Sequence, residues 1–497
     1  MIEERKLFLF LVVLICFGCT PNHSKEIMDK RLPSLYIMLP EEQLDSIIGN
    51  RDHKASAYAV FVSSDGDTLF SDDLEHIKSR GNSTFNAEKK AFNIKLIKRK
   101  QFLNLKNGKR FVLLANAFDK SNIRNAIALD LAAEMGLPAP RYAFLSLYIN
   151  SEYKGLYQIT NKVEECMDIN RIEGFLIEMN GIKIDNSIKI IFPKHLSNQE
   201  NDSMTELYNE RITFLSNCFE TDESTDTWIQ YNIDMQSFAR YYLLQEITHN
   251  MDAGVNSFFM NGIDNTAKLY AGPVWDFDLS LCPNSWQFYE WTKDEIIANA
   301  RIDSAGIEYS GAILHYLWKN SRFRDTVKYI YNNEISECCH KYLESGRIDS
   351  LVRLLESEAE KDYKKNGAPL NKNYLLETQK VHSFLKQRIE FLDWYFRTDI
   401  GERICVTYRD TWFGEWERIV QVWLPANNQI FIPKLLSDPP YNKAPIPFRL
   451  YYAGTDSIVP EGTIIQPNET LELKWRYPTW REVQLRRIKK KLKKLFG

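Results

Sequence analysis

The segment HNMDAGVNSFFMNGIDNTAKLYAGPVWDFDLS, residues 249–280, carries two small groups of acidic and amide side chains. The first group is Asp252 with Asn256, in a loop that follows a predicted helix. The second group is Asp276 with Asp278, which stand among apolar residues directly after a Gly-Pro pair. Because apolar neighbours favour burial and a buried charge needs a partner, the second group needs a cation or hydrogen-bond donors beside it.

The second group has two interpretations. On a strand, Asp276 and Asp278 point to the same side and can face one hard cation, while Phe277 packs on the other side. Two carboxylates this close repel each other unless a cation or hydrogen-bond donors stand between them. The alternative is a solvated strand edge with Trp275 as an ordinary core residue. We favour the metal interpretation, because a solvated edge would expose both acids while burying their neighbours.

The first group also has two interpretations. In protein kinases an acid accepts the hydroxyl proton of the acceptor, and an amide a few residues later holds a divalent ion. Asp252 and Asn256 have this spacing. The alternative is an Asp/Asn turn whose side chains satisfy their own backbone. The spacing alone does not decide between the two.

A third segment, RGNSTFNAEKKAFNIKL, begins at Arg80 and places a Gly-Asn-Ser-Thr turn before a strand that carries Lys95. The backbone N–H groups of such a turn can bind phosphate oxygens, and a lysine on the adjacent strand can reach the same phosphates. A β-turn beside a surface lysine is the commoner arrangement, since turns of this composition occur in any sheet.

The hydrophobic pattern predicts a mixed α and β chain. Short β-type runs between Leu35 and Leu114 predict an N-terminal antiparallel sheet. The segment SNIRNAIALDLAAEMGLPAP then predicts one helix, with Ser121 as its N-cap and Gly136 as its stop. A hairpin that turns at Asn150-Ser151 and a strand in EGFLIEMN follow.

The pattern also suggests boundaries. We expect a β-rich part over residues 35–198 and a helical part over 199–398, where the apolar period becomes helical. Alternating runs return and predict a small all-β module over 402–485, and residues 486–497 form a basic tail.

Composition excludes some classes of function. The net charge of −3 is a small difference between 63 basic and 66 acidic residues in 497, so no overall field attracts nucleic acid, and we expect no nucleic-acid partner. The cysteines beyond residue 19 are scattered, without a CxxC or Cys/His metal spacing. They do not form a dense disulfide framework.

Residues 1–19 predict an export signal. Two basic residues precede an apolar run over residues 7–17, which is too short for a comfortable membrane span, and Gly18-Cys19 follows. This pattern resembles a bacterial lipoprotein signal, with the mature chain beginning at lipidated Cys19. We therefore expect a lipoprotein anchored to a membrane of the bacterial cell envelope, facing the periplasm or the exterior. A signal cleaved elsewhere and an uncleaved anchor are the alternatives.

The order of the segments is more informative than any one of them. A Gly-containing turn, a strand lysine, a helix, an Asp/Asn loop and a metal-type aspartate follow one another as in a bilobal protein kinase. Together the segments resemble the CotH kinase family over roughly residues 35–395. They are RGNST with KKAFNIKL, DKSNIRNAIALDLAAEMGLPAP, LYINSEYKGLYQI, FLIEMN, HNMDAGVNSFFM and PVWDFDLS.

The resemblance implies an α+β, atypical bilobal kinase-like fold, with an N-terminal β-rich lobe and a helical lobe. It implies binding of ATP with Mg²⁺ or Mn²⁺ and phosphorylation of serine/threonine hydroxyls on secreted or surface proteins. Asp252 then matches the catalytic aspartate, Asn256 the asparagine that also binds metal, and Asp276 and Asp278 the metal-binding acids. The nucleotide-binding positions are Arg80, Gly81, Asn82, Ser83, Lys95 and Arg124.

Two positions depart from the family pattern or have a second interpretation. Many members carry an acid after the GLY turn where this chain has TNKVE, so the acid that pairs with Lys95 stays open. Arg124 either steadies the phosphates or pairs with Asp119. The candidate acids for Lys95 are Glu134, Glu164 and Glu178.

Two functions from different classes fit these observations. The first is an exported kinase-like enzyme, and the second is a catalytically silent surface binding or adhesion lipoprotein on the same scaffold. Scarcity of ATP outside the cytoplasm favours the second. The presence of Asp252, Asn256, Asp276 and Asp278 in order favours the first, because a binding scaffold has no need of four metal-type side chains.

Overall fold

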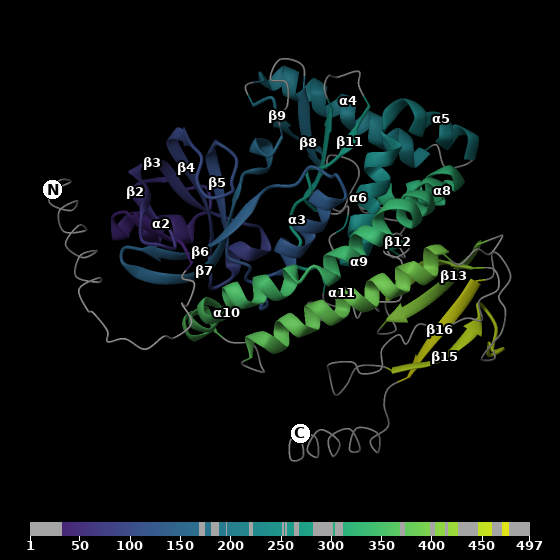
Figure 1. Ribbon diagram of the computed structural model, residues 1–497. Coiled ribbons are helices and arrows are strands. Elements are labelled where there is room, and N and C mark those ends of the chain that lie inside the picture. Colours follow the sequence, from purple (N-terminus) through teal and green to yellow (C-terminus); the bar gives the residue numbers. More distant parts are fainter. Residues whose placement is uncertain are drawn as a thin grey trace, which may run out of the picture. The chain divides into compact units, whose positions relative to one another are not determined.

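The computed structural model contains both helices and strands, with a β-rich N-terminal region and mainly helices after it (Figure 1). This agrees with the α and β content that the sequence predicts. The signal segment, Asp252 and the basic tail lie outside the described residues. The structure describes residues 32–167, 174–179, 188–194, 196–217, 222–250, 253, 256–262, 268–281, 302–303, 312–367, 373–397, 403–412, 416–425, 446–459 and 470–476.

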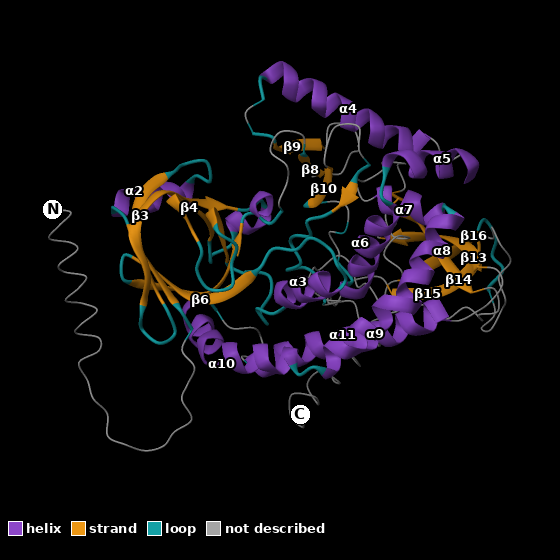
Figure 2. Ribbon diagram, turned by 45° about the horizontal axis from the view of Figure 1, so that its top comes forward, coloured by secondary structure: helices purple, strands orange, loops and turns teal. Residues whose placement is uncertain are grey.

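Seven strands close into a barrel in the order β1-β2-β3-β4-β5-β7-β6, seen as a ring in Figure 2. The antiparallel pairs agree with the predicted sheet. Closure adds a parallel pair, in which Ser34 of β1 lies opposite Ser146 of β6. A short helix, α2 (Glu41–Gly49), connects the first two strands. The strands are β1 (Ser34–Met38), β2 (Ala55–Val62), β3 (Thr68–Arg80), β4 (Ala91–Lys100), β5 (Gly108–Leu114), β6 (Tyr142–Ile149) and β7 (Glu152–Asn161).

The interior of the barrel is a packed apolar core. Along β4, Ile94 and Leu96 are buried inside, while Lys95 between them faces outward. The rings of Phe102 and Phe111 lie 4.8 Å apart within the same core. Functional polar side chains of this region therefore lie on the outer face of the barrel.

The helix α3 (Arg124–Glu134) follows β5 and begins later than the sequence predicts. Its N-cap residue is Ile123, and Ser121 is not the cap. The carboxylate of Asp119 accepts hydrogen bonds from the backbone N–H groups of Ser121 and Arg124, both at 2.9 Å. Asp119 therefore caps the start of the helix, the role that was expected of Ser121. The predicted stop is correct, because Gly136 has a φ of +74° directly after the helix.

A second sheet has the strand order β11-β10-β8-β9. It contains the predicted strand of EGFLIEMN and the short hairpin that leads into residues 272–280. The predicted turn of the β6–β7 hairpin is also correct, since Asn150 and Ser151 have φ values of +50° and +68°. The strands of the second sheet are β8 (Phe175–Met179), β9 (Ile188–Phe192), β10 (Phe258–Gly262) and β11 (Tyr270–Ala271).

The helices after residue 198 share one large apolar core with α3. A fully buried ion pair joins two of them, Glu246 of α6 and Arg388 of α11, at 2.7 Å. No helix among the described residues is long and apolar enough to span a membrane. The helices are α4 (Asn198–Asn217), α5 (Asp222–Asn232), α6 (Met235–Thr248), α7 (Ala312–Lys319), α8 (Ser321–Ile330), α9 (Ser336–Glu344), α10 (Arg347–Asn366) and α11 (Tyr374–Arg397).

The helix α10 docks on the outer face of the barrel at β6 and β7 through polar contacts. Lys89 lies 2.9 Å from Asp362 of α10 and donates to the carbonyl of Leu156 at 2.6 Å. The same carboxylate accepts the N–H of Leu156 at 3.0 Å. Gly155 permits this approach, because a Cβ there would lie 2.1 Å from the Asp362 carboxylate, and its φ is +131°.

A third sheet has the order β12-β14-β13-β16-β15. Four of its strands coincide with alternating runs beyond residue 402. The fifth, β12 (Ile302–Asp303), pairs with β14 and comes from well before the predicted boundary of the all-β module. The other strands are β13 (Arg403–Trp412), β14 (Trp416–Pro425), β15 (Ile446–Tyr452) and β16 (Thr470–Arg476).

Candidate active site

The segment GPVWDFDLS is a loop and not a strand. Residues 272–277 have no regular secondary structure, and Asp278 begins a turn. Gly272 has a φ of +106° and Asp276 a φ of +68°, so the alternation of a strand is interrupted. The expectation that a strand places both acids on one side is therefore wrong, because the left-handed backbone at Asp276 redirects the chain.

A half-buried cation lies beside the two acids. The guanidinium carbon of Arg80, at the end of β3, is 5.7 Å from the centre of the Trp275 ring. Burial lowers the pKa of Arg80, and three nearby carboxylates act against that shift. In order of strength they are Asp276, Asp278 and Glu178. Arg80 therefore supplies a positive charge near the acids, a neighbour that the sequence reasoning did not assign to them.

The end of the Asp/Asn loop contacts the same segment. The hydroxyl of Ser257 donates to the carboxylate of Asp276 at 3.3 Å, and Asn256 precedes it, half-buried. Ser257 has a φ of +53°, a backbone conformation that few serines adopt. The fold thus brings the residue that follows Asn256 into contact with Asp276. Asp252, the predicted catalytic acid, lies outside the described residues.

The N-terminus of α3 holds the loop in place. Arg124 donates to the carbonyl of Asp278 at 2.9 Å, and the side-chain oxygen of Asn125 accepts the N–H of Phe277 at 2.8 Å. Arg124 also pairs with Asp119 at 3.3 Å, as one of its two interpretations predicts. A contact of Arg124 with phosphate stays a prediction. Asn125 was missed, because nothing in the sequence links it to a segment 152 residues away.

The RGNST turn directs Arg80 toward the acids. Gly81 has a φ of +108°, and a Cβ there would lie 2.0 Å from the Thr84 hydroxyl, so only glycine fits. The side-chain oxygen of Asn82 accepts a hydrogen bond from Arg51 at 2.9 Å on the exposed side of the turn. Ser83 begins a short 3₁₀ helix. Phosphate contacts of Gly81, Asn82 and Ser83 stay predictions.

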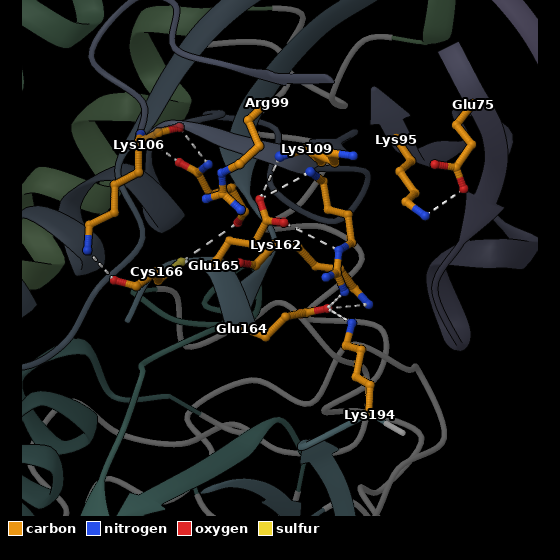
Figure 3. A network of polar contacts seen from close by, with 12 residues as sticks. Glu75, Lys95, Arg99, Lys106, Lys109, Lys162, Glu164, Glu165, Cys166 and Lys194 are labelled. Atoms are coloured by element: carbon orange, nitrogen blue, oxygen red, sulfur yellow. Dashed lines mark hydrogen bonds and ion pairs between the residues drawn. The ribbon is translucent and has the colours of Figure 1, made fainter. Parts of the chain in front are cut away.

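Lys95 pairs with an acid that the sequence did not suggest. Its ammonium lies 2.5 Å from Glu75 of the neighbouring strand β3, and the side chains are 30% and 45% exposed. In Figure 3 this pair lies apart from the network around Glu164. The short-range partner of Lys95 is therefore Glu75, outside the three candidates Glu134, Glu164 and Glu178.

Glu164 instead organises three other cations, two of which are labelled beside it in Figure 3. One of its oxygens lies 2.9 Å from Arg110 and 3.2 Å from Lys162, and also contacts Lys194. The carboxylate is only 3% exposed, whereas each cation keeps about a third of its side chain exposed. The buried carboxylate of Glu164 thus holds three cationic side chains together on the outer face of the barrel.

Comparison with protein families decides the relationship. The model of the family described as CotH kinase protein matches residues 77–392, which is more than half of the chain. This chain belongs to the CotH kinase family.

The matched range of the CotH family includes Arg80, Asn256, Asp276 and Asp278. Among solved structures, the chain is similar to the proinflammatory kinase CtkA of Helicobacter pylori, with 9% identity and a TM-score of 0.26. That match covers 60% of this chain and 92% of the CtkA chain. No curated protein matches the chain.

The donor set fits the metal that a CotH kinase would use with ATP. Asp276 and Asp278 offer carboxylate oxygens and Asn256 an amide oxygen, which are ligands that Mg²⁺ and Mn²⁺ prefer. Within the described ranges no group of three His, Cys, Asp or Glu side chains is placed to hold a metal alone.

Proposed function

We propose that this CotH-family protein is a kinase that transfers the γ-phosphoryl group of ATP to serine/threonine hydroxyls of secreted or surface proteins. The barrel and the helical part would act as the two lobes of a kinase-like fold. The observation that supports this most is the 3.3 Å contact of Ser257 with Asp276, beside Arg80. Ser257 and Asp276 lie 19 residues apart in the chain, and Arg80 comes from the distant RGNST segment.

Each residue then has a role that follows from its chemistry. A bound ATP–metal complex supplies the phosphoryl group and neutralises charge that develops on its oxygens. Asp276 and Asp278 bind the metal, with Asn256 as a further oxygen ligand. Asp252 accepts the proton of the acceptor hydroxyl. Catalysis of this kind depends mainly on positioning and on charge stabilisation, so the anchoring of the loop by α3 is part of the machinery.

Arg80 has two roles in this proposal. Without nucleotide, it compensates the charge of Asp276 and Asp278, which would otherwise repel each other. With nucleotide and metal bound, the Arg80 guanidinium would be able to pair with phosphate oxygens in a bidentate manner. Trp275 holds the guanidinium plane near both partners.

The test combines ligand binding with phosphate transfer. Mn²⁺–ATP should raise the thermal unfolding midpoint of the purified protein, because a ligand that binds only the native state stabilises it. Labelled ATP should give labelled serine-containing acceptor protein or autophosphorylated enzyme. Asp252→Asn should keep ATP binding and reduce transfer by at least ~100-fold, the scale of a positioned acid or base. Asp73→Asn, at an exposed position of β3, serves as the matched control.

Two outcomes would overturn the proposal. In the first, the wild-type protein neither binds ATP with either metal nor labels any acceptor. That result would favour the second function, a catalytically silent binding or adhesion lipoprotein. Transfer by Asp252→Asn at the wild-type rate shows that the catalytic acid lies elsewhere.

We also propose that the protein is held at a bacterial membrane through a lipid on Cys19. The support is the apolar run over residues 7–17 followed by Gly18-Cys19. Cys19→Ser should move the protein from the membrane to the soluble fraction or block its maturation. Identical fractionation of variant and wild type would contradict lipidation.

A further inference from the structure

The hairpin of β4 and β5 carries a run of positive charge that its own sequence does not balance. Residues 89–118 contain nine basic residues and no acidic one, in a chain whose net charge is −3. The fold uses the first two, because Lys89 pairs with Asp362 and Lys90 donates to the carbonyl of Phe85 at 2.6 Å. The other seven belong to the hairpin and are Lys95, Lys98, Arg99, Lys100, Lys106, Lys109 and Arg110.

Neighbouring acids balance the charges in the middle of the hairpin. Lys95 lies opposite Arg110 across the β4–β5 pair. Glu75 accepts a hydrogen bond from Lys95 at 2.5 Å, and Arg110 pairs with Glu164 at 2.9 Å and with Glu165 at 3.3 Å. These two cations therefore stabilise the surface of the barrel and leave little positive charge for a partner molecule.

The charges at the hairpin tip, which we define as residues 97–107, are not balanced in this way. Lys98 and Arg99 are exposed, and Lys100 is half-buried. Within the part of the chain that the structure describes, none of these three side chains forms an ion pair. Arg99 donates to the carbonyl of Asn107 at 2.6 Å, which joins the two sides of the tip. The unbalanced positive charge of the hairpin is thus concentrated at its tip.

The hairpin tip also exposes large apolar side chains. Ile97 is 46% exposed and Leu103 is 36% exposed, whereas Phe102 between them is buried, with its ring 4.8 Å from that of Phe111 in the barrel core. Phe102 therefore holds the tip against the barrel, and its two apolar neighbours are left facing solvent. Basic side chains interleaved with exposed apolar ones are typical of protein surfaces that lie at a membrane interface.

The chain enters the barrel at the end that carries the hairpin tip. Ser34 of β1 lies opposite Val62, the last residue of β2, and Val62 lies opposite Thr68, the first residue of β3. At the other end of β3, Arg80 lies opposite Ala91, the first residue of β4. Because β3 and β4 are antiparallel, β4 ends where β3 begins. Any segment that precedes Ser34 is therefore joined to the barrel at the end where the tip lies.

We propose that the hairpin tip binds the surface of a membrane that contains anionic lipid. Its basic side chains attract the headgroups, and its exposed apolar side chains enter the boundary with the acyl chains. The apolar side chains favour a lipid surface over an acidic peptide, which offers charge alone. The side chains that contact the membrane in this proposal are Ile97, Lys98, Arg99, Lys100 and Leu103.

The position of the tip fits the proposed anchor at Cys19, and this part of the argument rests on that proposal. Residues 20–33 span at most about 50 Å even when fully extended, so a lipid on Cys19 keeps this end of the barrel near the membrane. Arg80 lies at the opposite end of β3, at most about 40 Å away along the strand. A membrane-bound tip would thus leave the candidate active site open to acceptor proteins in the aqueous phase.

Two acids at the same end of the barrel determine which side of it meets the lipid. Asp65 and Asp67 are exposed in the turn between β2 and β3. Anionic headgroups repel them, so contact is made through the β4–β5 side. Their replacement should therefore strengthen binding, the opposite of the effect expected at the tip.

The experiment measures binding of the unlipidated chain to vesicles. Residues 32–497 form one compact unit, so a chain that begins at residue 20 keeps the described fold and lacks both the apolar run and Cys19. Co-sedimentation compares vesicles of phosphatidylcholine alone with vesicles that also contain phosphatidylglycerol. Wild type should bind the second kind at low salt and the first kind much more weakly.

The tip variant carries Lys98→Gln, Arg99→Gln and Lys100→Gln. It should bind the anionic vesicles about 30- to 100-fold more weakly than wild type, because each basic residue near such a surface contributes to the attraction. Its thermal unfolding midpoint should match that of wild type, since the tip side chains lie outside the core. The matched control removes the same charge from exposed lysines of three helices and should stay within about 2-fold of wild type: Lys341→Gln, Lys361→Gln and Lys380→Gln.

Two further variants test the apolar contact and the orientation. Ile97→Ser with Leu103→Ser should remove the binding that persists at high salt, because salt screens charges and leaves apolar burial in place. Asp65→Asn with Asp67→Asn should bind the anionic vesicles more tightly than wild type. Unchanged or weaker binding by the Asp65/Asp67 variant would contradict the proposed orientation of the barrel end.

The outcomes separate this inference from the other proposals. Failure of wild type to bind anionic vesicles, or equal binding by the tip variant and wild type, overturns the inference. Tight binding of polyglutamate together with full vesicle binding by the Ile97/Leu103 variant would also overturn it and point to an acidic peptide as the partner. Fractionation of Cys19→Ser tests the anchor, and phosphate transfer tests the kinase, and neither measurement depends on the tip.

Discussion

Two lysines of the barrel region, Lys89 and Lys78, have opposite electrostatic surroundings. Lys89, where α10 docks, lies 2.9 Å from Asp362, donates to a backbone carbonyl at 2.6 Å and stands over the Tyr157 ring at 4.9 Å. Lys78, near the candidate active site, is half-buried among other lysines. The first charge is compensated by a direct contact within the protein, whereas the second is influenced by one acid, Asp52, and by three lysines.

This difference distinguishes a cation that stabilises the fold from a cation that is available to bind a ligand. A buried ion that is paired and hydrogen-bonded has no capacity left for another partner, and removing its partner damages the fold. A group of like charges destabilises the folded protein slightly and is relieved by an anion. Substitutions at the α10 interface should therefore change stability, and substitutions near Asp276 should change ligand binding.

Asp362→Ala should have the largest effect. It leaves Lys89 buried without its carboxylate and also removes the acceptor for the N–H of Leu156. Breaking one side of a buried pair costs roughly 3–5 kcal/mol of unfolding free energy. Urea denaturation followed by tryptophan fluorescence measures this loss. Double replacement, Lys89→Met with Asp362→Leu, should be much closer to wild type, since neither charge is left behind.

Asp276→Ala should affect ligand binding and leave the fold intact. With ATP at 100 times its dissociation constant, wild type gains about 2.7 kcal/mol of stability from Mn²⁺–ATP, and the variant should lose that gain. Thermal unfolding with and without ligand measures the difference. Glu75→Ala, which removes an exposed acid from the same barrel, is the control. Undiminished stabilisation of Asp276→Ala by Mn²⁺–ATP would remove it from the metal site.

Gly155→Ala should destabilise the docked face by a smaller amount. The φ of +131° is unfavourable for alanine, and the added Cβ would meet the Asp362 carboxylate at 2.1 Å. Backbone strain of this kind costs on the order of 1–3 kcal/mol. The unfolding free energy should fall by that amount while ATP affinity stays unchanged. Weaker ATP binding in this variant would show that the two faces are coupled and would break the comparison.

Glu152→Gln should have the smallest effect and should depend on pH. Hydrogen bonds from Lys154 and Lys365 of α10 lower the pKa of Glu152 to about 2. A lowered pKa in the folded state stabilises above the ordinary carboxyl value, and that contribution is lost as pH falls toward 2. Because the side chain is 54% exposed, the effect is below about 1 kcal/mol.

The measurement for Glu152→Gln is the unfolding free energy between pH 7 and pH 3. Wild type should lose slightly more stability over this range than the variant. An identical acid dependence of the two proteins would mean that solvent screens the contact between α10 and β7 completely.

Features that depend on local pattern were predicted well from the sequence. The β6–β7 turn at Asn150-Ser151 follows from turn chemistry, and α6 (Met235–Thr248) follows from helical periodicity. The start of α3 was wrong by a few residues, because Asp119 competes with Ser121 for the same backbone N–H groups. Local rules alone do not decide between two capping side chains so close in the chain.

Features that depend on distant contacts were not predictable. The acids of residues 272–280 were recognised, but the left-handed backbone at Asp276 and the contact of Arg124 with the carbonyl of Asp278 arise from packing between distant segments. The same holds for the strand lysines. Alternation places both Lys78 and Lys95 outside the barrel, and only the three-dimensional neighbours distinguish them.

The parallel pair that closes the barrel also constrains how the chain reaches its folded state. Ser34 and Ile37 pair with Ser146 and Ile149, so this contact spans about 110 residues of chain. Contacts of such length form slowly, because the entropy of a long loop must be lost before the pairing is gained. Until β6 has been synthesised, one edge of β1 stays unpaired and can template pairing with another chain. The first strand is thus open to pairing with other chains until β6 is available.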